Sequence, residues 1–284
     1  AWSVEDGNSK GGMKFSIGTT NPIHSNNSHY AVIDVTSVGA SLCNSGYDGI
    51  SLKKGEEYIF SIFTNLLSGK SSKIMVQLVG DDGTVLASST IAVKGGMWSN
   101  NEVKMKVSSS AKKGKLLITP LSEGSYAFDM VSLFPVNTFK NRRNGLREDL
   151  AQTLADLKPR FVRFPGGCVA HGDGVDNIYD WKGSIGPLES RKPLRNLWGY
   201  HQTRGLGYHE YFLFCEDIGA EPLPVLAAGV PCQNSGTCSA HSSRHIDCGG
   251  QQGGIPIDKM DEYVQDVLDL IEYANGDAKN TYWG

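Results

Sequence analysis

The sequence predicts a multidomain β plus α/β chain: an antiparallel, jelly-roll-like β-sandwich over residues 1–137, then part of a (β/α)8 TIM barrel over residues 138–284. Three observations predict this. Short apolar runs separated by turn clusters fill the first part. Helical periodicity begins near Leu146. A short apolar strand ending at Phe164 then leads into a long loop rich in Gly, Asp, His and aromatic residues, as at the active-site face of an α/β barrel.

The composition excludes several classes of partner. The chain has 284 residues, 39% of them hydrophobic, and a net charge of −3. Without a basic excess, nucleic acid is not an expected partner. No apolar run approaches the roughly 20 residues of a membrane span, so no membrane association is expected. The chain begins at Ala1 without a secretory leader, which leaves its compartment open, with a periplasmic or extracellular location slightly favoured.

The first part is predicted to be entirely β. Turn clusters such as Asp81–Gly83 and Lys94–Gly96 separate its apolar runs, a spacing typical of a sandwich. A sugar-binding role and a purely structural role have equal weight, because a fold does not determine a function. The aromatic residues that could stack on sugar rings, if they are not core residues, are Trp2, Tyr30, Tyr47 and Trp98. The predicted strands are Tyr30–Val35, Glu57–Phe63, Lys73–Val79, Val85–Ser88, Glu102–Val107 and Lys115–Thr119.

The second part alternates helices and strands. Leucines at helical spacing from Leu146 to Leu157 predict a helix that Pro159 ends. A later helix carries Met260, Val264, Val267, Leu268 and Ile271 on one face. Between these helices we expect a strand at Arg160–Phe164, a helix at Tyr208–Ile218 and a strand at Leu223–Ala228, and the later helix itself at Asp258–Ala274.

This second part is expected to be incomplete. It opens with a helix, although parallel βα units begin with a strand, and it offers two strands where a closed barrel has eight. We therefore interpret the chain as the interior of a longer protein. The sandwich would be inserted after the first βα unit.

An ordered series of motifs follows the first predicted strand. The series closely resembles the α-L-arabinofuranosidases of glycoside hydrolase family 51, over about Asn144 to Gly284. The sandwich resembles, more loosely, the carbohydrate-binding-like domain inserted in some of these enzymes. The motifs are Arg163–Cys168, Trp181, Ile185–Pro187, Glu189 with Arg191, Trp198, Thr203, Gly205–Gly207, Glu210 and Gly219–Pro222.

The resemblance implies a glycoside hydrolase that removes terminal α-L-arabinofuranosyl groups from arabinan, arabinoxylan and related glycans with retention. Retention uses two carboxylates, an acid/base and a nucleophile, roughly 5 Å apart. In the family the acid/base follows a Gly-Asn dipeptide, and no Gly-Asn-Glu occurs here. Both catalytic glutamates are therefore expected outside this chain, which alone should be inactive. No cofactor is implied, and the family is often homo-oligomeric.

Part of the glycone pocket carries over to this sequence. By the resemblance, Arg163 would lie beside the carboxylates, Cys168 would contact sugar hydroxyls, and Trp198 would cover the furanose ring. From composition alone these residues would be a structural ion pair, a buried thiol and a core aromatic. Glu189 with Arg191 is interpreted as a loop ion pair. We assign no catalytic role to the carboxylates in the chain, among them Glu189, Glu210, Glu216 and Glu221.

A second cluster of potential ligands lies in a Gly/Ser-rich loop. The spacing Cys238-x2-His241-x3-His245-x2-Cys248 offers side chains that zinc accepts, but it departs from zinc-finger patterns. No metal site is assigned. Zinc binding, a loop disulfide among Cys232, Cys238 and Cys248, and free thiols all remain open. By contrast, Cys215 on a helical apolar stripe is predicted to be a buried thiol.

Two other functions compete with the arabinofuranosidase hypothesis. The first is a carbohydrate-binding protein without hydrolysis, built from the sandwich and a degenerate barrel. The second is another barrel hydrolase such as an endoglucanase, which the loop from Trp181 to Trp198 disfavours.

Overall fold

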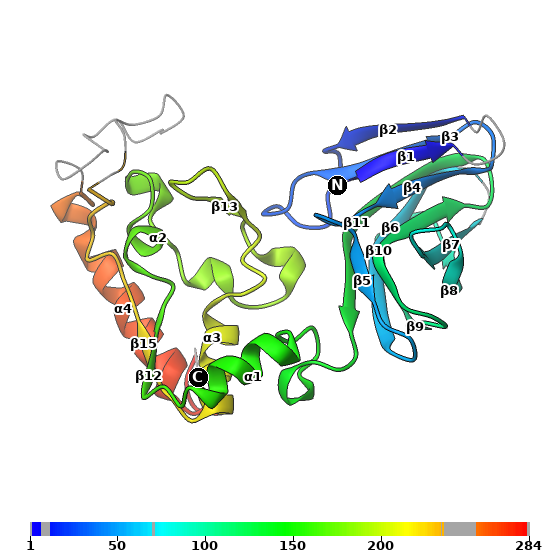
Figure 1. Cartoon of the computed structure of the whole chain (residues 1–284). Helices are drawn as coiled ribbons and strands as arrows, with labels where there is room; N and C mark the ends of the chain where they lie inside the picture. Colours follow the sequence, from blue (N-terminus) through cyan, green and yellow to red (C-terminus); the bar gives the residue numbers. More distant parts are fainter. Residues whose placement is uncertain (1, 7–11, 70–71, 234, 236–253, 283–284) are drawn as a thin grey trace. The chain divides into compact units, whose positions relative to one another are not determined.

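The computed structural model describes residues 2–6, 12–69, 72–233, 235 and 254–282 (Figure 1). Contacts divide the chain into two compact units, Ala1–Thr153 and Leu154–Gly284. The domain boundary predicted between residues 137 and 138 stays a prediction. In the part of the chain described, no helix is long and apolar enough to cross a membrane.

The first unit contains two antiparallel sheets. One has the strand order β1-β4-β10-β7-β8, with β5 paired to β10, and the other has the order β2-β3-β11-β6-β9. The strands are β1 (Trp2–Asp6), β2 (Met13–Gly18), β3 (Tyr30–Val35), β4 (Ala40–Asn44), β5 (Ile50–Leu52), β6 (Glu57–Ser68), β7 (Ser72–Val79), β8 (Val85–Val93), β9 (Ser99–Lys106), β10 (Ala111–Pro120) and β11 (Gly124–Pro135).

Strict alternation builds the core between these sheets. Along β6, every second residue is buried (Tyr58, Phe60, Ile62, Thr64 and Leu66) while the residues that alternate with them are less so, as expected for a strand with one face inward. Ile74, Val76 and Leu78 of β7 meet them from the other sheet in one apolar cluster. The predicted strand at Tyr30–Val35 is confirmed residue for residue, and the other five predicted runs all lie within or overlap observed strands.

The second unit places helices beside a two-stranded parallel sheet. In that sheet β12 runs parallel to β15, with Phe161 opposite Glu221 and Phe164 opposite Pro224. The helices are α1 (Glu148–Asp156, which spans the division between the units), α2 (Gly167–His171), α3 (Tyr208–Ile218) and α4 (Met260–Asn275), and the strands are β12 (Phe161–Phe164), β13 (Leu194–Arg195), β14 (His201–Gln202) and β15 (Glu221–Pro224). Short 3-10 helices lie at Phe139–Asn141, Val175–Asn177, Lys182–Ser184, Leu188–Ser190 and Ile257–Lys259.

An aromatic cluster forms the core of this unit. Phe164 of β12 packs on Tyr208, Tyr211 and Phe212 of α3, with ring centroids 4.6–5.5 Å apart. The predicted helix Tyr208–Ile218 is confirmed, and Gly219 ends it in the left-handed conformation at φ 67°. Cys215 is a buried thiol as predicted, and burial raises its pKa.

Three predictions for this unit need correction. The strand predicted at Leu223–Ala228 is β15, which begins earlier and ends at Pro224, because its pairing follows the end of β12. The loop after Phe164 contains the short helix α2. On α4, the predicted apolar face is largely exposed: Val264, Leu268 and Ile271 point to solvent while Asp269 and Leu270 are buried.

The structure supports the barrel prediction only as far as helices beside a pair of parallel strands. In the described residues the second unit has one pair of parallel strands, and its sheets do not close on themselves. Leu150 and Leu154 of α1 are exposed as well, and so is Leu157 just after the helix. That this unit is part of a (β/α)8 barrel therefore remains a proposal.

Candidate functional site

The Arg163 side chain lies on the open face of the β12–β15 pair. Since Phe164 is buried against α3, the alternation of a strand turns Arg163 to the opposite face, where it is exposed. A Cβ added to Gly167 would lie 3.5 Å from Arg163 Nη2, so the guanidinium lies over the turn that follows the strand. Among the described residues Arg163 makes no ion pair. The structural ion pair that its residue type alone suggests is therefore not seen there.

Cys168 follows directly, in the first turn of α2. The chain reverses at Gly166, whose φ of 118° is accessible to glycine but not to most other residues. Cys168 is half-buried, and its thiol is hydrogen-bonded to the thiol of Cys232. That hydrogen bond, together with burial, raises the pKa of Cys168 and keeps it protonated at neutral pH. A protonated thiol can donate to, or accept from, a hydroxyl.

The segment around Cys232 is fixed against α2. The backbone N–H of Cys232 donates to the Gly172 carbonyl at 3.2 Å, and His171 Nδ1 lies 2.7 Å from the Val230 carbonyl oxygen. Cys232 is buried and is not in a disulfide; its thiol donates to Gln233 Oε1 at 3.6 Å and also interacts with the thiol of Cys168. The remaining members of the predicted ligand cluster, Cys238, His241, His245 and Cys248, lie outside the described residues. Within the described residues no group of three potential metal ligands occurs.

Trp198 lies at the tip of a small hairpin formed by β13 and β14. The side-chain oxygen of Asn196 accepts the backbone N–H groups of Trp198 and Tyr200, each at 3.0 Å, and so closes the turn. Trp198 is 56% exposed and Tyr200 is 67% exposed, so neither is a core aromatic. The hairpin therefore exposes two aromatic rings to solvent on a turn that hydrogen bonds hold in place.

The hairpin is attached to the loop that follows α2. Arg195 Nη1 pairs with Asp173, and the Arg195 carbonyl accepts the side-chain amide of Asn177 at 3.2 Å. Asn177 Oδ1 in turn accepts the Asp173 backbone N–H at 2.8 Å. Figure 1 shows α2 and the β13 hairpin at the same end of the second unit.

Arg191 anchors one end of the hairpin. Its guanidinium forms a two-point pair with Glu210 of α3, with Nη1–Oε2 and Nη2–Oε1 distances of 2.9 and 2.8 Å. It also donates to the carbonyls of Gly186 and Arg204, at 3.0 and 2.8 Å. The predicted Arg191–Glu189 ion pair is therefore wrong, because the folded chain brings Glu210 to the buried guanidinium instead.

Glu210 also caps its own helix. Its carboxylate accepts the backbone N–H of Gly207 at 2.8 Å. Burial raises the pKa of Glu210, but the hydrogen bonds from Arg191 and Gly207 outweigh that effect and lower it overall. Glu210 is thus an ionised structural carboxylate, in keeping with its lack of an assigned catalytic role.

Arg204 holds the other end of the hairpin and was not singled out from the sequence. Its guanidinium lies 4.8 Å from the ring centroid of Tyr179 and donates to the Asp180 carbonyl at 2.8 Å. It has φ 59°, a left-handed conformation uncommon outside glycine. Its place between Thr203 and Gly205 in the motif series was the available signal.

The structure thus places Arg163 at the end of β12, with its guanidinium near Gly167, and Cys168 in the first turn of the helix that follows. It places Trp198 on a hairpin tied to the loop just after Cys168, with no direct contact to either. An exposed guanidinium, a protonated thiol and exposed aromatic rings can together bind a neutral ligand rich in hydroxyl groups.

Comparisons with known proteins point the same way. The family described as "Alpha-L-arabinofuranosidase 1 domain" matches residues 153–284. An extracellular exo-α-L-arabinofuranosidase of Streptomyces chartreusis is 38% identical over 87% of this chain and 29% of its own length. α-L-arabinofuranosidase 1 of Arabidopsis thaliana is 33% identical over 87% of this chain and 34% of its own length.

A solved structure extends the match to almost the whole chain. An arabinose-bound α-L-arabinofuranosidase of glycoside hydrolase family 51 superimposes with a TM-score of 0.85 and 27% identity, covering 99% of this chain and 43% of that one. This chain is a family 51 α-L-arabinofuranosidase-like protein. It spans 29%, 34% and 43% of the length of the Streptomyces enzyme, the Arabidopsis enzyme and the solved structure, respectively. Because the chain covers less than half of each of these proteins, the activity of the whole natural protein is proposed from the site and the family.

Proposed function

We propose that this chain forms the sugar-binding portion of a retaining α-L-arabinofuranosidase acting on terminal α-L-arabinofuranosyl groups. The observation that carries the proposal is the exposed Arg163 at the carboxyl end of a parallel strand, next to Cys168. In α/β proteins, ligands bind where the carboxyl ends of parallel strands feed their loops. The relationship to arabinofuranosidases supplies the class of ligand.

Arg163 is proposed to hold and orient a catalytic carboxylate. A guanidinium presents paired donors that match a carboxylate, and its charge keeps the carboxylate ionised. Retention needs two such carboxyl groups roughly 5 Å apart, one attacking the anomeric carbon while the other protonates the leaving oxygen. No described carboxylate is paired with Arg163, and no Gly-Asn-Glu occurs here. We therefore propose that both carboxylates lie in the natural protein outside residues 1–284.

Trp198 and Cys168 are proposed to bind the sugar itself. The flat indole offers an apolar surface to the C–H groups of a furanose ring, and its place on a closed turn limits the entropy lost on binding. The Cys168 thiol stays protonated at neutral pH and can hydrogen-bond to a sugar hydroxyl without adding charge.

The substrates and the setting of the protein follow from the same proposal. Arabinose-containing polysaccharides or oligosaccharides are the proposed partners. An extracellular or periplasmic site of action agrees with the extracellular location of the Streptomyces relative, and assembly of the natural protein into homo-oligomers is part of the proposal.

Release of nitrophenol from an aryl α-L-arabinofuranoside tests the proposal, with this chain compared to the natural gene product that contains it. Activity of the gene product and none of residues 1–284 is the expected result. Activity of residues 1–284 alone would show that their own carboxylates catalyse. If neither protein releases nitrophenol, a carbohydrate-binding protein without hydrolysis is favoured. Cleavage of other aryl glycosides instead would favour a different barrel hydrolase.

A further inference from the structure

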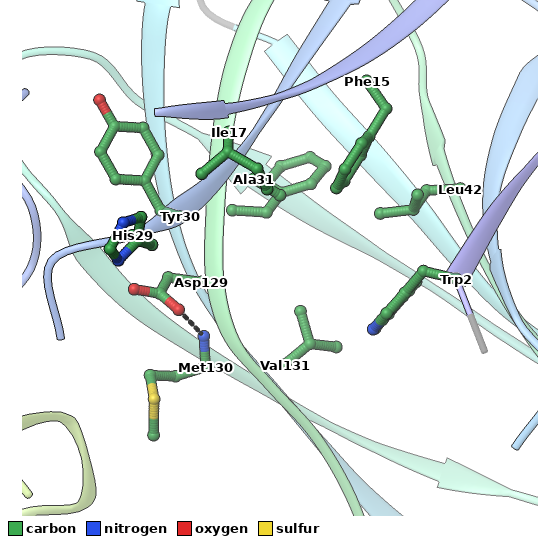
Figure 2. A pocket seen from close by; sticks show the side chains of 11 residues that line it. Trp2, Phe15, Ile17, His29, Tyr30, Ala31, Leu42, Asp129, Met130 and Val131 are labelled. Carbon is green, nitrogen blue, oxygen red and sulfur yellow. Dashed lines mark hydrogen bonds between the residues drawn. The ribbon is translucent and has the colours of Figure 1, made fainter. Parts of the chain in front are cut away.

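A pocket opens at one edge of the sandwich (Figure 2). It has a volume of about 250 Å³ and lies where the edge strands β1 and β2, one from each sheet, leave the core uncovered. This volume is slightly below the range typical of sites for drug-sized ligands, so it suits a ligand of one or two rings.

Exposed apolar side chains line this opening. Trp2 of β1 is 42% exposed and Phe15 of β2 is 46% exposed, while Phe128 of the core forms part of the floor. Large aromatic side chains on a concave surface that remain open to water are typical of binding sites. Tyr30 also lines the pocket, but it is buried and its ring packs edge to face on Trp98, with centroids 5.1 Å apart. These two aromatic rings therefore stabilise the sandwich.

The strand behind the pocket is irregular at this point. The pairing of β11 with β6 shifts register between Asp129 and Ser132, which marks a β-bulge. Within it, Met130 has φ 47°, an unusual conformation for a residue other than glycine. Bulges and such outliers re-aim side chains and occur preferentially at functional sites. Here they direct the segment Asp129–Met130 to the pocket (Figure 2).

Polar groups with unused hydrogen-bonding capacity line the same pocket. Asp129 Oδ1 accepts the Met130 N–H at 2.7 Å and Oδ2 accepts the Asn27 amide at 2.9 Å, which leaves each oxygen a second lone pair. His29 uses Nδ1 toward Ser28 at 3.0 Å, so its other ring nitrogen has no partner among the described residues. In the view of Figure 2, Asp129 and His29 lie toward one end and Trp2 toward the other.

We propose that this pocket binds one or two neutral sugar units of an arabinose-containing glycan, apart from the reactive site. Trp2 and Phe15 contact the C–H face of the sugar, and Asp129 and His29 hydrogen-bond to its hydroxyls. The inference that the sugar is arabinose rests on the function proposed above, whereas the inference that the ligand is a sugar rests on the pocket. A purely apolar ligand would leave the Asp129 lone pairs unsatisfied, and an anion would be repelled by the carboxylate.

The test is an NMR titration of the intact chain carrying ¹³C-methyl methionine, with arabinotriose as the probe. We expect the Met130 methyl signal, assigned with Met130→Leu, to move with a dissociation constant on the order of millimolar. The Met97 methyl is the control, because Met97 is exposed in the same unit and does not line the pocket. No movement of Met130 at about 50 mM sugar, or equal movement of both methyls, would overturn the proposal.

Matched variants separate this pocket from the reactive site. Trp2→Ala should weaken the Met130 response about tenfold, whereas Tyr47→Ala, which removes a fully exposed aromatic outside the pocket, should leave it unchanged. Trp198→Ala should also leave it unchanged. If the Met130 response followed Trp198 instead of Trp2, the pocket would not be the site. Because methyl shifts and hydrolysis are measured separately, either proposal can fail while the other stands.

Discussion

The Arg191–Glu210 pair offers the most direct test of how the hairpin is held. Replacing Glu210 by Gln preserves the size of the side chain but leaves the Arg191 guanidinium, 4% exposed, without its counter-charge. Breaking a fully buried pair costs about 3–5 kcal/mol. Here Glu210 is 28% exposed and Arg191 keeps backbone carbonyl acceptors, so we expect a loss of about 2–3 kcal/mol in the free energy of unfolding.

Calorimetry and near-UV circular dichroism would measure this loss. We expect the melting temperature of the second unit to fall by roughly 6–12 °C. Glu189→Gln is the matched control, since it makes the same chemical change at a part-buried carboxylate that has no partner among the described residues. Equal shifts for the two variants would refute the view that Arg191 depends on Glu210. Hydrogen exchange of residues 194–202 should also rise in Glu210→Gln only, since Arg191 holds the base of that hairpin.

The same pair has a defined dependence on pH. The folded-state pKa of Glu210 lies below its ordinary value, so its contribution to stability is present above about pH 4.3, the unfolded pKa, and is lost as the pH falls through the folded pKa. The difference in unfolding free energy between the unmodified chain and Glu210→Gln should therefore be largest at neutral pH and shrink in acid. A difference that stays constant down to about pH 2 would contradict this assignment.

Further predictions concern the proposed sugar site. In the natural gene product, Arg163→Lys should lower kcat/KM for the aryl arabinofuranoside about 10- to 100-fold without changing the melting temperature, because an ammonium loses the paired geometry. Trp198→Ala should raise KM about tenfold, and an unchanged KM would remove the indole from the sugar site. With oxidised glutathione, Cys168 and Cys232 should form a disulfide and release two molecules of reduced glutathione. Peptide mass spectrometry would detect the link, with buried Cys215 as the unreacted control.

Local patterns in the sequence were sufficient for much of the fold. The alternation in Tyr30–Val35 and the helical pattern in Tyr208–Ile218 specify their elements without help from distant residues. The motif series likewise pointed to the family and to the residues now found at the end of β12. The helix α2 was not singled out because its five residues carry too little periodicity, and the edge strands β1 and β2 were missed because most of their residues are exposed, so no buried face imposes a pattern.

Contacts between distant residues decided the rest. The apolar stripe of α4 predicted its buried face, yet Lys182 pairs with both Asp266 and Asp269, and the Trp181 indole donates to the Asp266 carbonyl at 3.0 Å. These contacts turn the side of the helix that carries Asp269 and Leu270 inward. Sequence spacing cannot reveal them, since the partners lie more than 80 residues apart.

The sequence by itself determined the class of the elements with a clear apolar pattern, the family and the likeness of Arg163, Cys168 and Trp198 to a sugar site, because these depend on residue types in order along the chain. Only the tertiary structure decided that Arg191 pairs with Glu210, that the Cys168 thiol meets Cys232, and that Trp2 and Asp129 share a pocket. Each of these joins segments whose meeting depends on strand pairing and side-chain packing across the fold, and a linear pattern does not encode that geometry.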